Sequence, residues 1–114
     1  MMAWNELDRR RVEKIVSDFV ESRRPPVELR AQLDLAFRLE GQVVDLFEKR
    51  RSLHGHDVET PVARLRYVKS RKVWKLYWMR ADLKWHRYQP LPESDRLEVL
   101  LREIDEDSIA CFFG

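Results

Sequence analysis

The hydrophobic positions near the N-terminus repeat with the period of an α-helix. Apolar residues three and four positions apart form one stripe, made of Val12, Ile15, Val16, Phe19 and Val20, with Trp4 and Leu7 extending it. Asn5 is suited to cap the start of this helix, and Asp8 places a negative charge in its first turn. Pro25 and Pro26 end the helix, because the residue before a proline disfavours helical backbone angles.

The hydrophobic period then changes to two, which predicts β-strands. The apolar residues Leu33, Leu35, Phe37 and Leu39 alternate with polar or small ones, and Gly41 marks a turn into a returning strand from Val43. The returning strand carries Val44 and Leu46 on one face and Val43 and Phe47 on the other. We therefore expect local cover on its second face. The segment 52–61 that follows is expected to be a loop.

Three further strands are expected between 62 and 88. Two-residue turns at Ser70–Arg71 and Ala81–Asp82 divide the side chains of the three strands between the two sheet faces in the same way. Neither turn has the Asn-Gly type of sequence that is typical of a β-hairpin. The expected core face is Ala63, Leu65, Tyr67, Trp74, Leu76, Trp78, Leu83 and Trp85. The expected second face is Arg64, Arg66, Lys75, Tyr77, Met79, Lys84, His86 and Tyr88.

A second helix is expected after Pro90 and Pro92, capped by Ser94. Its apolar stripe is Leu97, Leu100, Leu101 and Ile104, and it should end at 105–107, where acidic residues oppose the helix dipole. An apolar tail follows, which we expect to dock on the core or on a second subunit. The pattern predicts one α+β domain over 1–114: an N-terminal helix, a five-stranded, mainly antiparallel sheet of two plus three strands, a C-terminal helix and the apolar tail.

Composition indicates a globular protein of the cytoplasm. The chain is 44% hydrophobic with 3 glycines, has no apolar run long enough to span a bilayer and begins without an apolar signal core. Its 1 cysteine, Cys111, cannot form an internal disulfide, and its apolar neighbours favour packing over reactivity.

The net charge of +2 conceals an uneven distribution. Residues 62–88 contain nine Lys or Arg and one acid, whereas residues 91–114 contain seven acids and two Arg. On the expected second face, Arg64, Arg66, Lys75 and Lys84 could contact phosphates. Tyr77, His86 and Tyr88 could stack on unpaired bases, which is how several single-strand binding domains work. The alternative is a solvated face whose charge the acidic segment neutralises.

Metal binding and catalysis have weaker support. His54, His56 and Asp57 lie close in sequence, but a metal site needs a third or fourth convergent ligand, for which Glu59 or His86 would have to serve. No nucleophile elbow, phosphate loop or carboxylate pair is present. We therefore expect no metal or other cofactor and no catalytic residue. An enzyme centred on His86 is the least favoured alternative.

Three segments are similar to one bacterial family. They are "RLEGQVVDLFEKRR" (38–51), "RYVKSRKVWKLYWMRADLKWHRY" (66–88) and "DEDSIACFFG" (105–114). Over about 27–114 the chain resembles the uncharacterised family catalogued as domain of unknown function 3024. The resemblance implies no activity or ligand.

The sequence thus favours a small binding module without catalytic activity. Single-stranded nucleic acid is the leading partner, with no membrane association. A protein-interaction module or obligate homodimer, using sheet edges and Phe112–Phe113, is the main alternative.

Overall fold

The computed structural model describes residues 5–113, and the predicted α+β class is confirmed. The predicted order of helix, strands and helix also holds, with a sixth strand added and a short 3₁₀ helix between the first helix and the first strand. The elements are α1 (Glu6–Arg23), η1 (Val27–Leu29), β1 (Leu33–Glu40), β2 (Val43–Arg51), β3 (Asp57–Val68), β4 (Val73–Met79), β5 (Trp85–Arg87), β6 (Glu93–Ser94) and α2 (Leu97–Glu106).

Helix α1 begins and ends as its sequence predicts. The Asn5 side chain accepts a hydrogen bond from the backbone N–H of Asp8 at 2.8 Å, so it caps the first turn. At the other end, the Arg24 guanidinium donates two hydrogen bonds, of 2.9 and 2.8 Å, to the Asp34 carboxylate. These bonds hold the pKa of Asp34 below its ordinary value and join the end of α1 to the start of β1.

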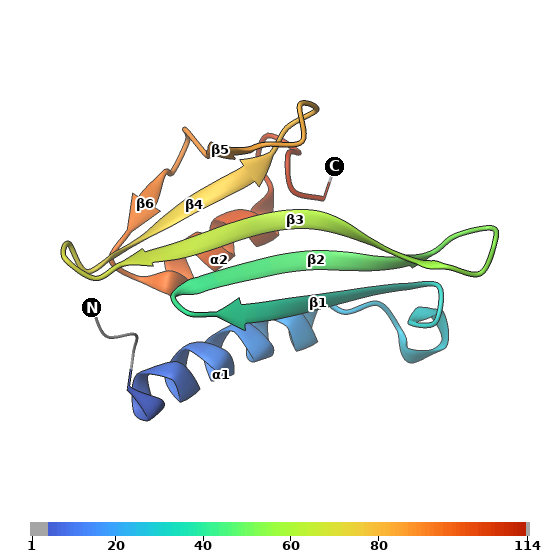
Figure 1. Ribbon diagram of the computed structural model, residues 1–114, viewed down its shortest axis with the longest axis horizontal. Helices are drawn as coiled ribbons and strands as arrows, with labels where there is room; N and C mark the ends of the chain where they lie inside the picture. Colours follow the sequence, from blue (N-terminus) through green and yellow to red (C-terminus); the bar gives the residue numbers. More distant parts are fainter. Residues whose placement is uncertain (1–4, 114) are drawn as a thin grey trace.

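The sheet is an antiparallel meander in the order β1-β2-β3-β4-β5, with β6 pairing to β4 as well (Figure 1). Strand β3 begins at Asp57, so the expectation of a loop through Pro61 is wrong. Backbone pairing there runs from Arg51↔Asp57 to Phe47↔Pro61. All side chains from Asp57 to Pro61 are exposed, and such a hairpin needs no apolar alternation for its backbone groups to pair.

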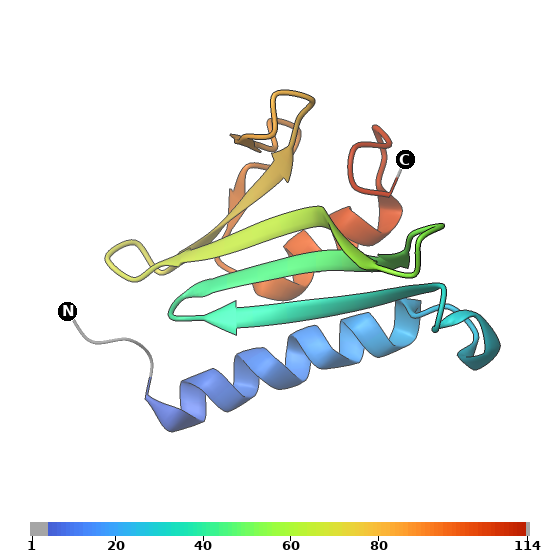
Figure 2. The same ribbon diagram turned by 45° about the vertical axis from the view of Figure 1, so that its right-hand side comes forward.

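Both helices cover the same face of the sheet and bury one core against it (Figures 1 and 2). Helix α2 passes behind β2 and β3 in the view of Figure 1, and α1 lies along β1. The helices contribute one buried stripe each, Val12, Val16 and Val20 from α1 and Leu97, Leu100, Leu101 and Ile104 from α2. The strands contribute their alternate residues, such as Leu35, Val44, Leu46, Leu65 and Leu76.

The predicted register of β3 with β4 is confirmed. Tyr67 lies opposite Trp74 and Leu65 opposite Leu76. The turn has four residues, 69–72, instead of the expected two. Adding a residue to each side of a turn leaves the pairing unchanged, so both strands keep their predicted faces.

The predicted register of β4 with β5 is wrong by one residue. The turn comprises three residues, Ala81 to Leu83, between Arg80 and Lys84, whose backbones are hydrogen-bonded at 3.2 Å. Leu83 adopts the left-handed conformation, with φ of 63°, as is common for the last residue of a three-residue hairpin loop. Trp78 therefore faces His86, and Met79 faces Trp85.

This shift exchanges the inward and outward side chains of the last strand. Trp85 and Leu83, expected in the core, lie outside it, and Leu83 is 78% exposed. Tyr88, expected on the second face, is instead fully buried. Its hydroxyl donates a 2.7 Å hydrogen bond to Glu103 of α2, and burial raises its pKa to about 12.

The C-terminal segment packs on the core of its own chain. Helix α2 starts at Leu97 without a side-chain cap, so the prediction that Ser94 caps it is wrong, because Ser94 belongs to β6. Beyond the helix, the Asp107 carboxylate accepts hydrogen bonds from three successive backbone N–H groups, those of residues 111–113. Phe112 thereby enters the core, and burial raises the pKa of the Cys111 thiol to about 11. The predicted docking of the tail is confirmed.

Replacing Leu83 with glycine tests the conformation of the β4–β5 turn. A left-handed backbone costs an L-residue about 1–2 kcal/mol, and glycine avoids this cost. Glycine also increases the entropy of the unfolded chain, which destabilises the folded state by about 0.5–1 kcal/mol. We therefore expect Leu83→Gly to raise the free energy of unfolding by up to about 1 kcal/mol. Urea denaturation provides the measurement.

Leu53→Gly is the matched control, because Leu53 is fully exposed but lies outside the left-handed region. We expect it to lower the free energy of unfolding. If Leu83→Gly destabilised the protein as much as Leu53→Gly does, the left-handed turn would be contradicted.

Candidate binding face of the sheet

The face of the sheet opposite the two helices is uncovered by any other described element, and we call it the open face. One row of side chains crosses all five strands of the meander, in the order Arg38, Asp45, Arg64, Tyr77 and Arg87. Other open-face residues include Glu40, Val43, Phe47, Lys49, Arg66, Lys75, Met79, Trp85 and Glu93.

A shallow cleft of about 240 Å³ lies on the open face. Phe47 lines it and is only 6% exposed, yet Phe47 does not belong to the core cluster under the helices. A β-bulge between Leu46 and Phe47 changes the register with β3 at this point, placing Pro61 opposite Phe47. The Arg38 guanidinium covers the Phe47 ring at 4.6 Å. The sequence predicts local cover over the second face of β2, which is the open face. Neighbouring open-face side chains such as Arg38 provide this cover.

Arg64 connects the cleft to the aromatic residues of β4 and β5. Its guanidinium donates two hydrogen bonds to Asp45, of 2.7 and 3.0 Å, and lies 4.9 Å from the centre of the Trp85 ring. The hydrogen bonds to Asp45 raise the pKa of Arg64. The paired geometry fixes the guanidinium plane, so Trp85 is held in place beside Tyr77 and Met79.

Several open-face cations have carboxylate partners. Arg38 binds Glu59 at 3.1 Å, and Glu93 accepts hydrogen bonds from Arg71 at 2.7 Å and Arg87 at 3.4 Å. The hydrogen bond from Arg71 is the main reason that the pKa of Glu93 is lowered. These pairs neutralise much of the charge that the sequence concentrates in 62–88.

Arg66 and Lys75 are the exception. They lie directly opposite each other on β3 and β4, and among the described residues neither makes an ion pair within 4.0 Å. Like charges in directly opposed positions repel and destabilise a sheet. Lys75 also lies opposite Glu93 of β6, and its charge contributes to the lowered pKa of that carboxyl. Arg66 and Lys75 thus form a close pair of cations beside Tyr77, with Glu93 at its edge.

The structure brings together four of the seven residues predicted to bind nucleic acid. Arg64, Arg66, Lys75 and Tyr77 share the open face. The placement of Lys84, His86 and Tyr88 with them is wrong, because the three-residue turn reverses the faces of the last strand.

Each of these three residues has another environment. Lys84 is exposed at the end of the turn, opposite Arg80, and Tyr88 is buried beneath the sheet. His86 points to the other side of β5, where its Nε2 is 2.8 Å from a carboxylate oxygen of Asp82.

Trp85 and Arg87 are the open-face residues of β5 that sequence reasoning missed. Asp82 is the signal that could have indicated the correct turn. An aspartate side chain that accepts a hydrogen bond from the backbone N–H two residues later is typical of such turns. Here the Asp82 carboxylate accepts a 3.0 Å hydrogen bond from the Lys84 N–H.

The other candidate features do not converge on a site. His54 lies in the turn before β3 and Asp57 is the first residue of that strand. Within residues 5–113, no group of three or more His, Cys, Asp or Glu side chains is arranged to hold a metal ion. None of the helices described is long and apolar enough to cross a membrane.

Comparison with protein families matches the model described as Domain of unknown function (DUF3024) over residues 4–114. The chain belongs to this family. The DUF3024 match begins before α1, so the first helix belongs to the family pattern together with the segment 27–114 that the sequence resemblance identified. No curated protein and no solved structure matches the chain.

The open-face carboxylate Glu93 should make stability depend on pH. Its pKa is lowered in the folded state, so its contribution is present above the unfolded value of 4.5 and is lost as the pH falls through the folded value. We expect Glu93→Gln to be less stable than the wild type at pH 7 and the difference to shrink as the pH falls below 4.5, as measured by urea denaturation. A stability difference that stayed constant with pH would show that Arg71 and Arg87 do not stabilise the Glu93 carboxylate.

Proposed function

We propose that this DUF3024 protein is a non-catalytic module that binds single-stranded nucleic acid on the open face, along β4. The observation that carries the proposal is the position of Tyr77. It lies between two neighbouring cations that make no direct ion pair, Arg66 and Lys75, and the exposed side of Trp85. Phosphate contacts supply sequence-independent affinity, and flat aromatic rings accept any base.

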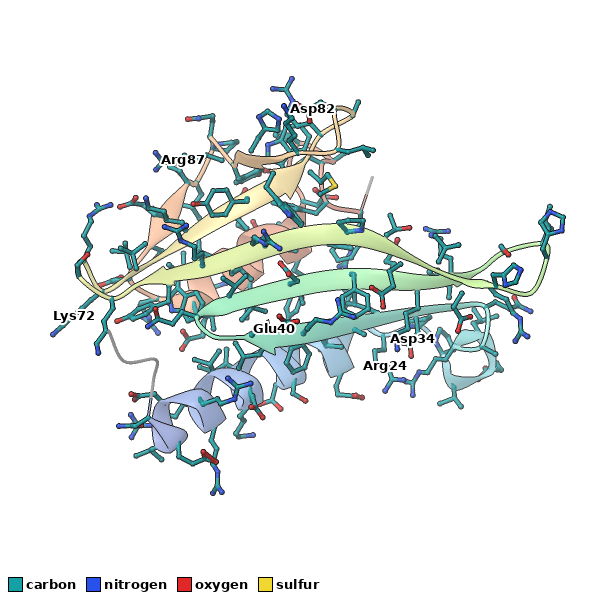
Figure 3. The ribbon with its side chains drawn as sticks, viewed as in Figure 1. Arg24, Asp34, Glu40, Lys72, Asp82 and Arg87 are labelled. Carbon is teal, nitrogen blue, oxygen red and sulfur yellow. The ribbon has the colours of Figure 1, made fainter. Side chains whose placement is uncertain are left out.

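The charge along β4 suits a strand that runs parallel to it. Lys72 lies in the turn at one end of β4 and Asp82 in the turn at the other end, as Figure 3 shows. Lys75 lies between these turns, with Arg66 beside it on β3. Phosphates near Arg66 and Lys75 would relieve the repulsion between the two side chains, so the free energy of this repulsion adds to affinity.

The aromatic residues follow along the same path. Tyr77 and Trp85 are partly exposed on neighbouring strands, and Arg64 holds the Trp85 ring at 4.9 Å. A base beside Tyr77 would reach the cleft between Trp85 and Phe47. Since the cleft volume of about 240 Å³ is less than that of ordinary ligand pockets, about 300–1,000 Å³, one base is the largest group it suits.

The half of the open face over β1 and β2 does not favour an anion. Glu40 and Asp45 lie there, and the Arg38 charge is already balanced by Glu59. This distribution directs a polyanion toward β3, β4 and β5. The homodimer alternative has lost its main apolar contact, because Phe112 packs in the core of its own chain.

Fluorescence anisotropy with labelled single-stranded DNA and RNA tests the proposal. We expect binding that weakens steeply between about 50 and 200 mM salt. Arg66→Gln/Lys75→Gln should bind more weakly, and its slope of log affinity against log salt should fall by about 1.4, or about 0.7 for each lost phosphate contact. The change removes a like-charge pair together with the attraction between Lys75 and Glu93, so the variant should remain folded with a stability close to that of the wild type.

Lys14→Gln/Arg102→Gln removes the same charge from exposed positions of α1 and α2, on the opposite side of the sheet, and serves as the control. It should retain the wild-type salt slope. Absence of binding even at low salt, or an equal loss in both double variants, would refute a specific nucleic-acid surface along β4.

A further inference from the structure

We propose a second binding site, for a phosphate monoester, between the β4–β5 hairpin and the segment after α2. A hollow of about 290 Å³ lies there, on the opposite side of β5 from Tyr77. Its lining includes Trp78, Arg80, His86, Arg87, Gln89 and Ile109. We call it the hairpin pocket.

The side chains around the hairpin pocket favour an anion. The Arg80 guanidinium, the His86 imidazole and the Gln89 carboxamide can donate hydrogen bonds to oxygen. In contrast, the Arg87 guanidinium already binds Glu93 at 3.4 Å. Among the described residues, no Asp or Glu lines the pocket. The Asp82 carboxylate contacts the His86 ring at 2.8 Å and accepts a hydrogen bond from the Lys84 N–H at 3.0 Å. Arg80 makes no ion pair within 4.0 Å among the described residues.

The positions of these donors are partly fixed in advance. Asp82 holds the Nε2 side of the His86 ring, which leaves Nδ1 as the other nitrogen available to a ligand. The Arg80 guanidinium lies 5.5 Å from the centre of the Trp78 ring. A side chain held before binding loses less conformational entropy when the ligand arrives.

The apolar wall indicates that the anion carries an organic group. Trp78 is partly exposed and Ile109 is 55% exposed, although both are large hydrophobic side chains. A phosphate monoester combines a dianion, which suits guanidinium donors, with an attached group that can contact Trp78 and Ile109. The two sources of this chemistry are a free mononucleotide and the terminal phosphate of a nucleic-acid strand.

Geometry links the hairpin pocket to the open face without making the two sites the same. Arg87 lines the pocket and is opposite Tyr77 in the register of β4 and β5. A strand bound along β4 could therefore place its end near β5. Binding of a free monoester requires only the hairpin pocket, so this site can exist even if the open face binds no nucleic acid.

Isothermal titration calorimetry with adenosine 5′-monophosphate, adenosine and inorganic phosphate tests the hairpin pocket. We expect the monophosphate to bind, adenosine to bind at least about tenfold more weakly, and inorganic phosphate to compete. Arg80→Gln and His86→Gln should each weaken monophosphate binding, by about tenfold for Arg80→Gln. Arg10→Gln on α1, an equally exposed arginine, should leave it unchanged.

Oligonucleotides with a 5′-phosphate or a 5′-hydroxyl distinguish the two sources. A preference for the phosphorylated strand that disappears in Arg80→Gln would assign the pocket to strand ends, whereas monophosphate binding without such a preference would assign it to free monoesters. Equal binding of adenosine and its monophosphate, no binding of either, or unchanged monophosphate binding in Arg80→Gln would overturn the proposal. Thermal unfolding of each variant shows whether it is folded.

Discussion

The three-residue turn between β4 and β5 decides which side chains of the last strands enter the core. With Leu83 in the left-handed conformation, Arg80 pairs with Lys84, and every later pair follows from that one. Tyr88 then points toward α2, where its hydroxyl meets Glu103, while Trp85 points to the open face, where it meets Arg64. One turn therefore controls both the attachment of α2 and the composition of the candidate binding face.

The acidic C-terminal segment neutralises the basic strands only in part. Glu93 forms ion pairs with Arg71 and Arg87. In contrast, Glu103 accepts a hydrogen bond from Tyr88, and Asp107 accepts hydrogen bonds from the backbone of the C-terminal segment. Neither Arg66 nor Lys75 makes an ion pair within 4.0 Å among the described residues, although Lys75 lies opposite Glu93 of β6. The acidic segment therefore balances the charge of Arg71 and Arg87 and leaves Arg66 without an ion pair among the described residues.

The parts of the fold that follow from local patterns could be predicted. The cap at Asn5, the alternation in β1 and the facing of β3 with β4 each depend on a few neighbouring residues. The hairpin from Arg51 to Asp57 could not, because its strands are exposed on both faces and carry no alternation. The sixth strand could not either, since two residues are too few for any period.

The candidate site was predictable only up to β4. Alternation along β3 and β4 correctly predicts their register, and with it the shared face of Arg64, Arg66, Lys75 and Tyr77. The faces of His86 and Tyr88 instead depend on whether the β4–β5 turn has two or three residues. Leucine gives no hint of a left-handed conformation, which favours glycine or asparagine. The resemblance over 27–114 correctly gave the family, which itself specifies no ligand.

The most direct test of the account is an NMR titration with a short single-stranded oligonucleotide, observing the tryptophan indole N–H signals. Trp85 lies on the open face and Trp74 is buried on the helix-covered face, so one protein contains both the reporter and its internal reference. We predict that the Trp85 signal and the backbone amides of Lys75 and Tyr77 shift, while Trp74 and α1 do not. Shifts confined to the helices, or none at a saturating concentration, would contradict binding at the open face.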